Sequence, residues 1–317
     1  MTAALSIIVV NYNTGRLLPD MFAALDRAAN GIDMRCILVD NASSDDSMAV
    51  LRDSFPHQLV LANESNVGFG RANNQALPYV DGGYVLLLNT DAFVAPDTLS
   101  GTIEYMESHP ECGVLGVRLI GRDGVLQPCC RYFPTPLNVF LARTGLGRFF
   151  PWVRMVDDMD WDHASVRECD WVPGCYYLVR REVIDKVGLF DPRYFLYYEE
   201  VDHCRRVKDA GWKVVFYPHT SVVHIGGESA KSVGELTEGG RQISALQIES
   251  ELLYFRKHHG RLGLALHMVL VSLGDLVLAA KALVRGRGVA AIAGCRQHAR
   301  TVWRLLRQTR YAVQPTR

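Results

Sequence analysis

The feature that most constrains the fold of this chain is an alternation of short apolar runs and amphipathic stretches in its N-terminal part. Apolar runs that predict buried strands occupy residues 5–13, 35–43, 57–65 and 82–93. Helical patterns lie between them, at residues 17–29 and 70–80. Strands separated by helices of this length pair in parallel, with helices on both faces. The sequence therefore predicts an α/β fold with a Rossmann-like, mostly parallel sheet.

Polar side chains end each of these runs: Asn11, Asp40, Asn63 and Asp91. Ligands of such sheets bind at the carboxyl ends of the strands, so one crevice should receive all four. A carboxylate at Asp91 is costly unless a cation faces it, and a divalent cation that bridges phosphates would serve. Asp40 suits a base or a ribose. Both aspartates are also good turn residues, and that alternative stays open.

The stretch NVGFGRANN, residues 66–74, raises the question of dinucleotide binding. Gly68 and Gly70 give G-x-G, but Asn73 takes the place of the third glycine and the motif follows the third strand. A nicotinamide-dependent dehydrogenase is thereby disfavoured. Arg71 suits either a phosphate or base contact or a surface position.

The stretch YYEEVDHCRR, residues 197–206, places adjacent carboxylates against aromatic rings. Glu199 and Glu200 fall in the first turn of a predicted helix, which Gly211 ends. Mutual repulsion and poor solvation raise the pKa of one of them, which suits a general base. An ordinary acidic first turn is the alternative. Asp202 and Arg206 are spaced as an i,i+4 ion pair and predict a structural support.

His224 ends a further apolar run and precedes a glycine-rich, polar stretch that reaches Gly240 and has the composition of a segment that moves. A lone histidine in such a place is more often a hydrogen-bonded core residue than a ligand. Residues 131–162, with three prolines and no clean period, predict a long excursion over the crevice.

The net charge of zero conceals a basic C-terminal region. Residues 256–317 carry 12 Lys and Arg against one acid, Asp275. The unbroken apolar run at 262–274 is short of the roughly 20 residues that a membrane span needs. We expect either a helical pair on an anionic membrane surface or a hairpin docked on the body. Few aromatics accompany the basic residues, so no nucleic acid is expected.

Cellular location is predicted from the same features. No signal-peptide pattern opens the chain, so the body is expected in the cytoplasm, peripheral on the inner face of the cell membrane. The eight cysteines lack C-x-x-C spacing and fit reduced thiols.

Seven blocks in chain order resemble the family 2 glycosyltransferases of GT-A fold, in particular their bacterial rhamnosyltransferase-like branch. The blocks are SIIVVNYNTG, LVDNASSDDS, NVGFGRANNQA, LLLNTDA, WVPGCYYLVRREV, GLFDPRYFLYYEEVDHCRRVKDAGWKVVFYP and VVHIGGES. The resemblance covers about residues 5–230. It implies a glycosyltransferase domain over 1–240 and a basic amphipathic helical region over 241–317.

The resemblance also implies roles for individual residues. Asp40 and Arg71 would contact the nucleotide, and Asn11 and Asn66 would shape its pocket. Asp91 takes the last place of the family's D-x-D metal motif, where it would bind both nucleotide and Mg²⁺ or Mn²⁺. Asn89 replaces the first acid, which leaves fewer carboxylates for the metal.

On the acceptor side, the resemblance assigns the remaining roles. His224 would be the second metal ligand. Glu200 would be the catalytic base, with Asp202 in reserve. Trp171, Gly174 and Glu199 would line the substrate side of the crevice.

The resulting prediction is an inverting glycosyltransferase. It would move a sugar, with rhamnose indicated by the branch, from a nucleoside-diphosphate sugar to a hydroxyl of a glycan or lipid-linked acceptor in cell-surface polysaccharide synthesis. Two alternatives remain: a sugar-nucleotide pyrophosphorylase, whose glycine-rich basic loop this chain lacks, and a non-catalytic nucleotide-sugar or polysaccharide binding module.

Overall fold

The four predicted N-terminal strands form one half of a single sheet. The computed structural model describes residues 5–226, 241–286 and 288–317. Within it, parallel strands lie in the order β3-β2-β1-β4. Their bounds are Leu5–Asn11 for β1, Met34–Asp40 for β2, Leu59–Ala62 for β3 and Tyr84–Asn89 for β4. The carboxyl ends of β1 and β2 meet, because Asn11 is paired with Asp40 in the ladder.

The other half of the sheet mixes strand directions. Beyond β4 the order continues β8-β6-β9-β5, and β7 pairs with β9. The bounds are Ala92–Val94 for β5, Cys112–Ile120 for β6, Arg167–Cys169 for β7, Tyr176–Arg180 for β8 and Lys213–His224 for β9. Strands β6 and β9 are parallel, whereas β8, β5 and β7 run antiparallel to their neighbours. The predicted mostly parallel α/β fold is confirmed.

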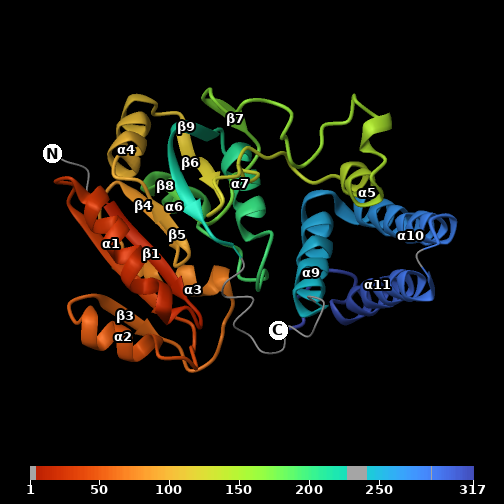
Figure 1. Ribbon diagram of the computed structural model, residues 1–317, viewed down its shortest axis with the longest axis horizontal. Coiled ribbons are helices and arrows are strands. Elements are labelled where there is room, and N and C mark those ends of the chain that lie inside the picture. Colours follow the sequence, from red (N-terminus) through yellow and green to blue (C-terminus); the bar gives the residue numbers. More distant parts are fainter. Residues whose placement is uncertain (1–4, 227–240, 287) are drawn as a thin grey trace.

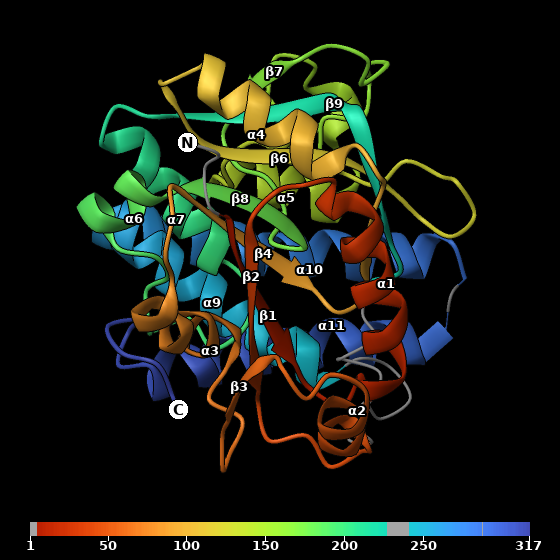
Figure 2. The same cartoon turned by 90° about the vertical axis from the view of Figure 1, so that its left-hand side faces the viewer.

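Helices cover both faces of the sheet (Figure 2). On one face α1, Leu18–Ala29, packs against α4, Thr98–Ser108, and against α2, Ser47–Ser54. The other face carries α3, Phe69–Ala76, α6, Arg181–Val187, and α7, Glu199–Asp209. Short 3₁₀ turns occupy Gly15–Leu17, Leu77–Tyr79 and Gly147–Phe149. The sheet residues between these layers, such as Ile7, Ile8 and Leu86, are fully buried, which fixes the strand ends rigidly.

The excursion at 131–162 contains a helix that the prediction missed. Helix α5 spans Pro136–Thr144 and begins with a capping box: Asn138 N donates to Thr135 Oγ1, and Thr135 N donates to Asn138 Oδ1. A proline at its first position also favours this start. Although the excursion begins beside the crevice, α5 itself packs on α10. The expectation of a cover over the crevice was therefore wrong for its central part.

Three helices, α9, α10 and α11, form a separate layer beside the sheet (Figure 1). They span Arg241–His258, Gly260–Val284 and Gly288–Gln308. Within the described residues, α10 alone is long and apolar enough to cross a membrane. Asp275 in its middle is nevertheless buried, and it pairs with Arg143 of α5 and His298 of α11. The expected boundary after residue 240 and the segment expected to move both fall on 227–240, outside the described residues.

Candidate active site

A buried hydrogen-bond network joins the carboxyl ends of β1 and β2. Asn11 Nδ2 donates to Asp40 Oδ1 at 2.7 Å and to Ser43 Oγ at 3.0 Å. Ser43 donates to Asp40 through both its backbone N–H and its hydroxyl. Thr14 Oγ1 in turn donates to Asn11 Oδ1 at 2.7 Å. These bonds fix the Asp40 carboxylate at the strand end, where a base or a ribose would bind.

A second network positions the loop before α3. Asn41 Nδ2 donates to Asn66 Oδ1 at 2.8 Å, and Asn41 Oδ1 accepts from the N–H of Val67 at 3.0 Å. Asn66 Oδ1 also accepts from the N–H of Gly68. Asn66 therefore shapes this edge of the crevice through the backbone. Sequence reasoning did not single out Asn41, although it follows Asp40 in the same polar run.

Gly68 brings this loop into direct contact with the segment before α7. Its φ is +90°, and a Cβ at this position would lie 2.5 Å from the carbonyl oxygen of Phe195. Phe69 N donates to the same oxygen at 2.9 Å. Only glycine fits both the backbone conformation and the close approach.

Arg71 lies in the first turn of α3 and is held by main-chain groups. Its Nε donates to Pro192 O at 2.7 Å, and its Nη2 donates to Arg317 O at 2.9 Å. Arg71 thus ties α3 to the segment before α7 and to the C-terminal turn. Nη1 has no hydrogen-bond partner among the described residues and remains available to an anionic ligand.

Asp91 and His224 come together from distant parts of the sequence. They are neighbours because Ala92 of β5 is paired with His224 of β9. His224 Nε2 lies 3.6 Å from Asp91 Oδ1, while Asp91 Oδ2 accepts from the N–H of Gly226 at 3.0 Å. On the other side of the ring, His224 Nδ1 lies 2.9 Å from Gln127 Oε1. Gln127 was not predicted; it orients the imidazole so that Nε2 faces the carboxylate.

This pair has the chemistry of a metal site. Burial lowers the pKa of His224, despite the opposing charge of Asp91, so the imidazole is neutral at pH 7 and its Nε2 lone pair is free. Gln127 supplies the outer hydrogen bond that metal-binding histidines make. The described residues contain no group of three or more His, Cys, Asp or Glu side chains suited to a metal. Mg²⁺ and Mn²⁺ in nucleotide sites need only one or two protein ligands, because phosphate oxygens complete the set.

Glu199 and Glu200 begin α7 from a strained turn. Tyr197 and Tyr198 both have φ of +70°, a conformation that aromatic residues rarely adopt. This turn directs the two glutamates inward: Glu199 is buried and Glu200 partly so. One carboxylate oxygen of each lacks a hydrogen-bond partner within the described residues. Strain and unpaired buried oxygens together make this turn, residues 197–200, the candidate catalytic turn.

The two carboxyl groups have raised pKa values for related reasons. Burial raises the pKa of Glu199 well above its ordinary value, and the charge of Glu200 raises it further. Burial also raises the pKa of Glu200, although the cation of Arg131 opposes the shift. Of the two, Glu199 thus holds its proton more strongly, and Glu200 is the one assigned as proton acceptor.

Cys175 links Glu200 electrostatically to the Asp91–His224 pair. Burial raises the pKa of the Cys175 thiol, and the charges of Asp91 and of Glu200 raise it further, so both carboxylates lie within electrostatic range of this thiol. Cys175 precedes β8, and its carbonyl accepts from Asn89 N at the end of β4. The predicted base and the predicted metal ligand Asp91 are therefore both near the start of β8.

Asp202 has a different environment, which corrects its place as reserve base. Its side chain is fully buried and forms ion pairs with Arg206, Lys257 and His258. Burial alone would raise its pKa, but the hydrogen bond from His258 and the charges of Lys257 and Arg206 lower the pKa to about 2. The predicted i,i+4 support by Arg206 is confirmed. A carboxylate that is paired on every side and this acidic does not serve as a base.

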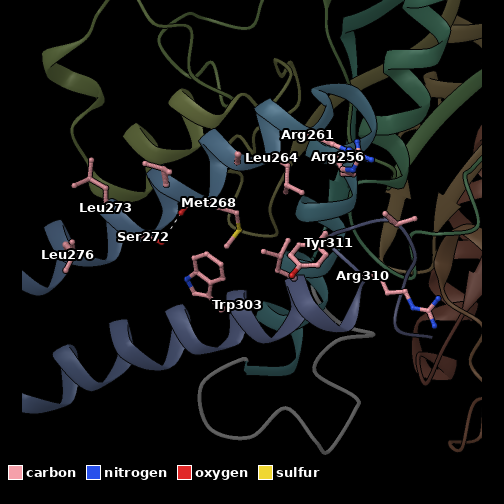
Figure 3. Close-up of a pocket in the computed structure, with 14 residues that line it drawn as sticks. Arg256, Arg261, Leu264, Met268, Ser272, Leu273, Leu276, Trp303, Arg310 and Tyr311 are labelled. Atoms are coloured by element: carbon pink, nitrogen blue, oxygen red, sulfur yellow. Dashed lines mark hydrogen bonds between the residues drawn. The ribbon is translucent and has the colours of Figure 1, made fainter.

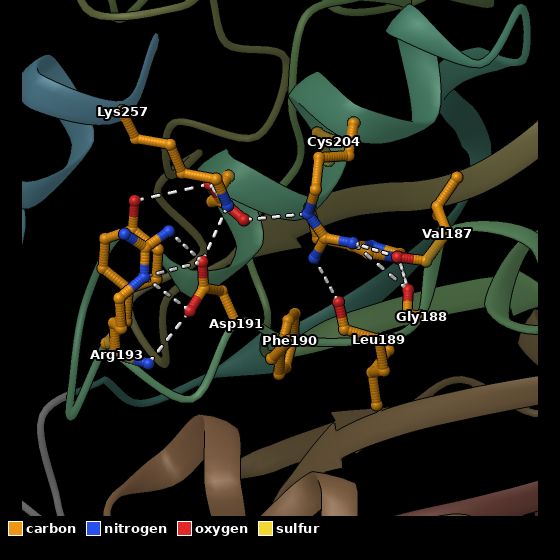
Figure 4. Close-up of polar contacts among 12 residues, drawn as sticks. Val187, Gly188, Leu189, Phe190, Asp191, Arg193, Cys204 and Lys257 are labelled. Atoms are coloured by element: carbon orange, nitrogen blue, oxygen red, sulfur yellow. Dashed lines mark hydrogen bonds and ion pairs between the residues drawn. The ribbon is translucent and has the colours of Figure 1, made fainter.

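The same cluster joins the catalytic turn to α9. Asp191 pairs with Arg193 and with Lys257, which reaches it from α9 at 2.8 Å (Figure 4). Because Lys257 also pairs with Asp202, one α9 side chain holds both ends of the segment 191–202.

Trp171 and Gly174 lie just before β8, close in sequence to Cys175. Trp171 is buried, its Nε1 donates to Tyr132 O, and the Arg131 guanidinium stacks 4.0 Å above its ring. Since Arg131 also acts electrostatically on Glu200, Trp171 positions charge beside the predicted base. Gly174 faces Phe69, 3.8 Å from the position of an added Cβ.

Solved structures share this architecture. A mannosyltransferase of Pyrobaculum calidifontis, solved with GDP-Man and Mn²⁺, aligns over 97% of this chain and 83% of its own, with a TM-score of 0.55 and 17% identity. TarS of S. aureus aligns over 96% of this chain and 91% of its own, with a TM-score of 0.51 and 12% identity. The fold is that of the GT-A glycosyltransferases.

Sequence comparisons then give the family. The family model described as glycosyl transferase family 2 matches residues 6–128. An N-acetylglucosaminyl-diphospho-decaprenol L-rhamnosyltransferase of Mycobacterium tuberculosis is 29% identical over 239 residues, 71% of this chain and 76% of the relative. The rhamnosyltransferase WbbL of Escherichia coli is 30% identical over 167 residues, 50% of this chain and 60% of its own. The chain is thus similar to family 2 glycosyltransferases, and to rhamnosyltransferases among them.

Proposed function

We propose that this protein transfers rhamnose, with inversion, from a nucleoside-diphosphate sugar to a hydroxyl of a lipid-linked glycan acceptor. The proposal is carried by the Asp91–His224 pair and by Glu200 at the start of α7, which has a buried carboxylate oxygen left unpaired in the described part of the chain. The names of the mycobacterial and E. coli relatives support rhamnose, and the mycobacterial name supports an acceptor on a polyprenyl diphosphate.

The donor would lie over the ends of β1 and β2. Asp40, held by Asn11 and Ser43, would accept hydrogen bonds from the nucleoside. Arg71 would reach the phosphates through its free nitrogen, and Asn66 would shape the loop beside them. Asp91 and His224 would hold Mg²⁺ or Mn²⁺, which when bound offsets the negative charge that grows on the departing diphosphate.

Proton transfer is assigned to Glu200. Its raised pKa makes it a stronger base than an exposed glutamate, so it would take the acceptor's hydroxyl proton as that oxygen attacks the anomeric carbon. Direct displacement inverts the anomeric configuration. Glu199, buried beside it, would line the substrate side together with Trp171 and Gly174.

We also propose that the C-terminal helices rest on the inner, anionic face of the cell membrane. Apolar side chains of α10 stand exposed to solvent, with Leu262 at 87%, Leu276 at 68% and Val284 at 89%. The region 256–317 that holds them carries 12 Lys and Arg, and its one acid, Asp275, is already paired inside. An exposed apolar stripe flanked by cations fits an anionic bilayer surface. The helical region 241–317 is thus proposed as the membrane-facing unit beside the transferase domain 1–240.

Transfer from dTDP-rhamnose to a short prenyl-diphosphate-linked N-acetylglucosamine, with and without Mn²⁺, tests the function. Glu200→Gln should lose at least about a hundredfold in turnover, because general-base assistance is typically worth that much. Glu182→Gln is the matched control, since Glu182 is an exposed first-turn glutamate of α6. Full turnover by Glu200→Gln would refute the assignment of the base.

Donor turnover also separates an enzyme from a binding module. The wild-type protein should slowly release free nucleoside diphosphate from its sugar nucleotide when Mn²⁺ is present. Binding of sugar nucleotides without any release, across a panel of donors, would favour the non-catalytic alternative.

A further inference from the structure

An open apolar groove lies outside the crevice, between α10 and α11 (Figure 3). Its volume is about 940 Å³. Apolar side chains line it along its length, among them Leu264, Met268, Leu276 and Trp303. A space of this size and lining is at the upper end of the range for ligand sites.

One end of this groove is cationic. Arg261 lies in the first turn of α10, Arg310 follows the end of α11, and Arg256 comes from the last turns of α9. Figure 3 shows these three arginines at one end and Leu273 and Leu276 at the other. No acidic side chain lines the groove within the described residues. A trough with guanidinium groups at one end matches a hydrocarbon chain that ends in phosphate.

The length of the groove also fits such a chain. Fifteen residues separate Arg261 from Leu276 along α10, which corresponds to about 22 Å at 1.5 Å per residue. Ser272, a small residue between them, leaves the floor open. A single extended hydrocarbon chain can therefore lie along the helix pair while its head remains with the arginines.

The cationic end of the groove adjoins the catalytic turn through α9. Ser250 Oγ donates to Leu196 O at 2.9 Å, and Glu251 accepts from the Tyr198 hydroxyl at 2.9 Å. Arg256 lies just beyond them on the same helix. A head group bound there would lie on the helix that also contacts the segment before Glu199 and Glu200.

We propose that the groove between α10 and α11 binds the hydrocarbon chain of the acceptor lipid, with Arg256, Arg261 and Arg310 on its diphosphate. This rests on the proposed function and adds to it the site that holds the acceptor. The chain in the groove and the phosphates at the arginines leave the attached sugar to reach the crevice.

Binding to the full-length protein tests the groove directly, without any donor. Farnesyl diphosphate, farnesol and inorganic pyrophosphate serve as probes in calorimetry, and phosphatidylglycerol vesicles serve as a fourth. Farnesyl diphosphate should bind at least about tenfold more tightly than either half-molecule, since both the apolar contacts and the charge-assisted bonds are needed. Equal binding of farnesol or of pyrophosphate would overturn the proposal, as would binding to the vesicles with no binding of farnesyl diphosphate.

Paired variants locate the binding. Arg310→Glu should weaken farnesyl diphosphate at least about tenfold, whereas Arg307→Glu, a basic position outside the lining, should not. Ser272→Trp should block the groove, whereas Val284→Trp, at an exposed site outside it, should not. Unchanged binding in both Arg310→Glu and Ser272→Trp overturns the proposal. Mn²⁺-dependent release of nucleoside diphosphate in the same preparations reports on the proposed function separately.

Discussion

Replacement of Asp202 by asparagine tests whether the acid next to the catalytic pair is structural. The side chain is fully buried and carries one negative charge against Arg206, Lys257 and His258. Asparagine keeps the shape and removes the charge, so three cationic or polar donors lose their counterion. We expect a loss of stability and only a modest loss of turnover in the folded fraction.

The magnitude follows from the pKa of Asp202. A fall from 3.8 to about 2 in the folded state corresponds to between about 2 and 3 kcal/mol of stability at neutral pH. Removing one member of a buried ion pair typically costs about 3 to 5 kcal/mol, so about 3 kcal/mol is expected. Because the folded pKa is depressed, this contribution is present above pH 3.8 and disappears as pH falls through 3.8 toward 2.

Urea unfolding followed by far-ultraviolet circular dichroism at pH 7 measures the loss. Asp209→Asn is the matched control, because Asp209 forms an i,i+4 pair with Arg205 on the same helix but is 63% exposed. Its loss should stay below about 0.5 kcal/mol. An unchanged midpoint for Asp202→Asn together with a hundredfold loss of turnover would refute the structural role and return Asp202 to the position of base.

Three further predictions concern the pocket. Burial raises the pKa of Glu199, so the stability of the wild-type protein falls as pH rises above the unfolded pKa of about 4.5. Glu199→Gln should therefore raise the urea midpoint at pH 8 and leave it unchanged at pH 4. An equal gain at both pH values would contradict the burial argument. Gly68→Ala should lower the thermal midpoint of the protein much more than Gly31→Ala, because Gly31 shares a positive φ but has open space around it. Equal midpoints would show that the Phe195 carbonyl moves away to make room for the added methyl group. Gln127→Ala should weaken Mn²⁺ activation about 10- to 100-fold, because the ring of His224 loses the hydrogen bond that orients it. A Mn²⁺ titration of donor turnover measures this effect. An unchanged titration curve would exclude Gln127 and His224 from the metal site.

The catalytic turn shows how far local sequence reasoning reaches. The run of aromatics before Glu199 and Glu200 predicted a raised pKa for one of the two carboxyl groups, and burial raises both. It did not predict the left-handed backbone of Tyr197 and Tyr198, because side-chain propensity disfavours that conformation. Long-range contacts impose it: Ser250 of α9 bonds to Leu196, and Glu251 bonds to Tyr198.

Asp202 was ambiguous in the sequence for the same kind of reason. Its i,i+4 partner Arg206 was visible as a local pattern and is confirmed. Lys257 and His258, which decide its pKa, come from a helix more than fifty residues away. No spacing rule links such positions.

The sequence by itself determined what depends on near neighbours. Apolar runs of strand length, interrupted by helical stretches, require a sheet whose polar strand ends meet, and Asn11 and Asp40 do meet there. Only the tertiary structure decided the partners that come from remote segments: Gln127 on His224, the carbonyls on Arg71, and the arginine-ended groove between α10 and α11. Such contacts form because packing of the whole core brings distant segments together. They stabilise the fold only after the entropy cost of closing the long loops between those segments has been met.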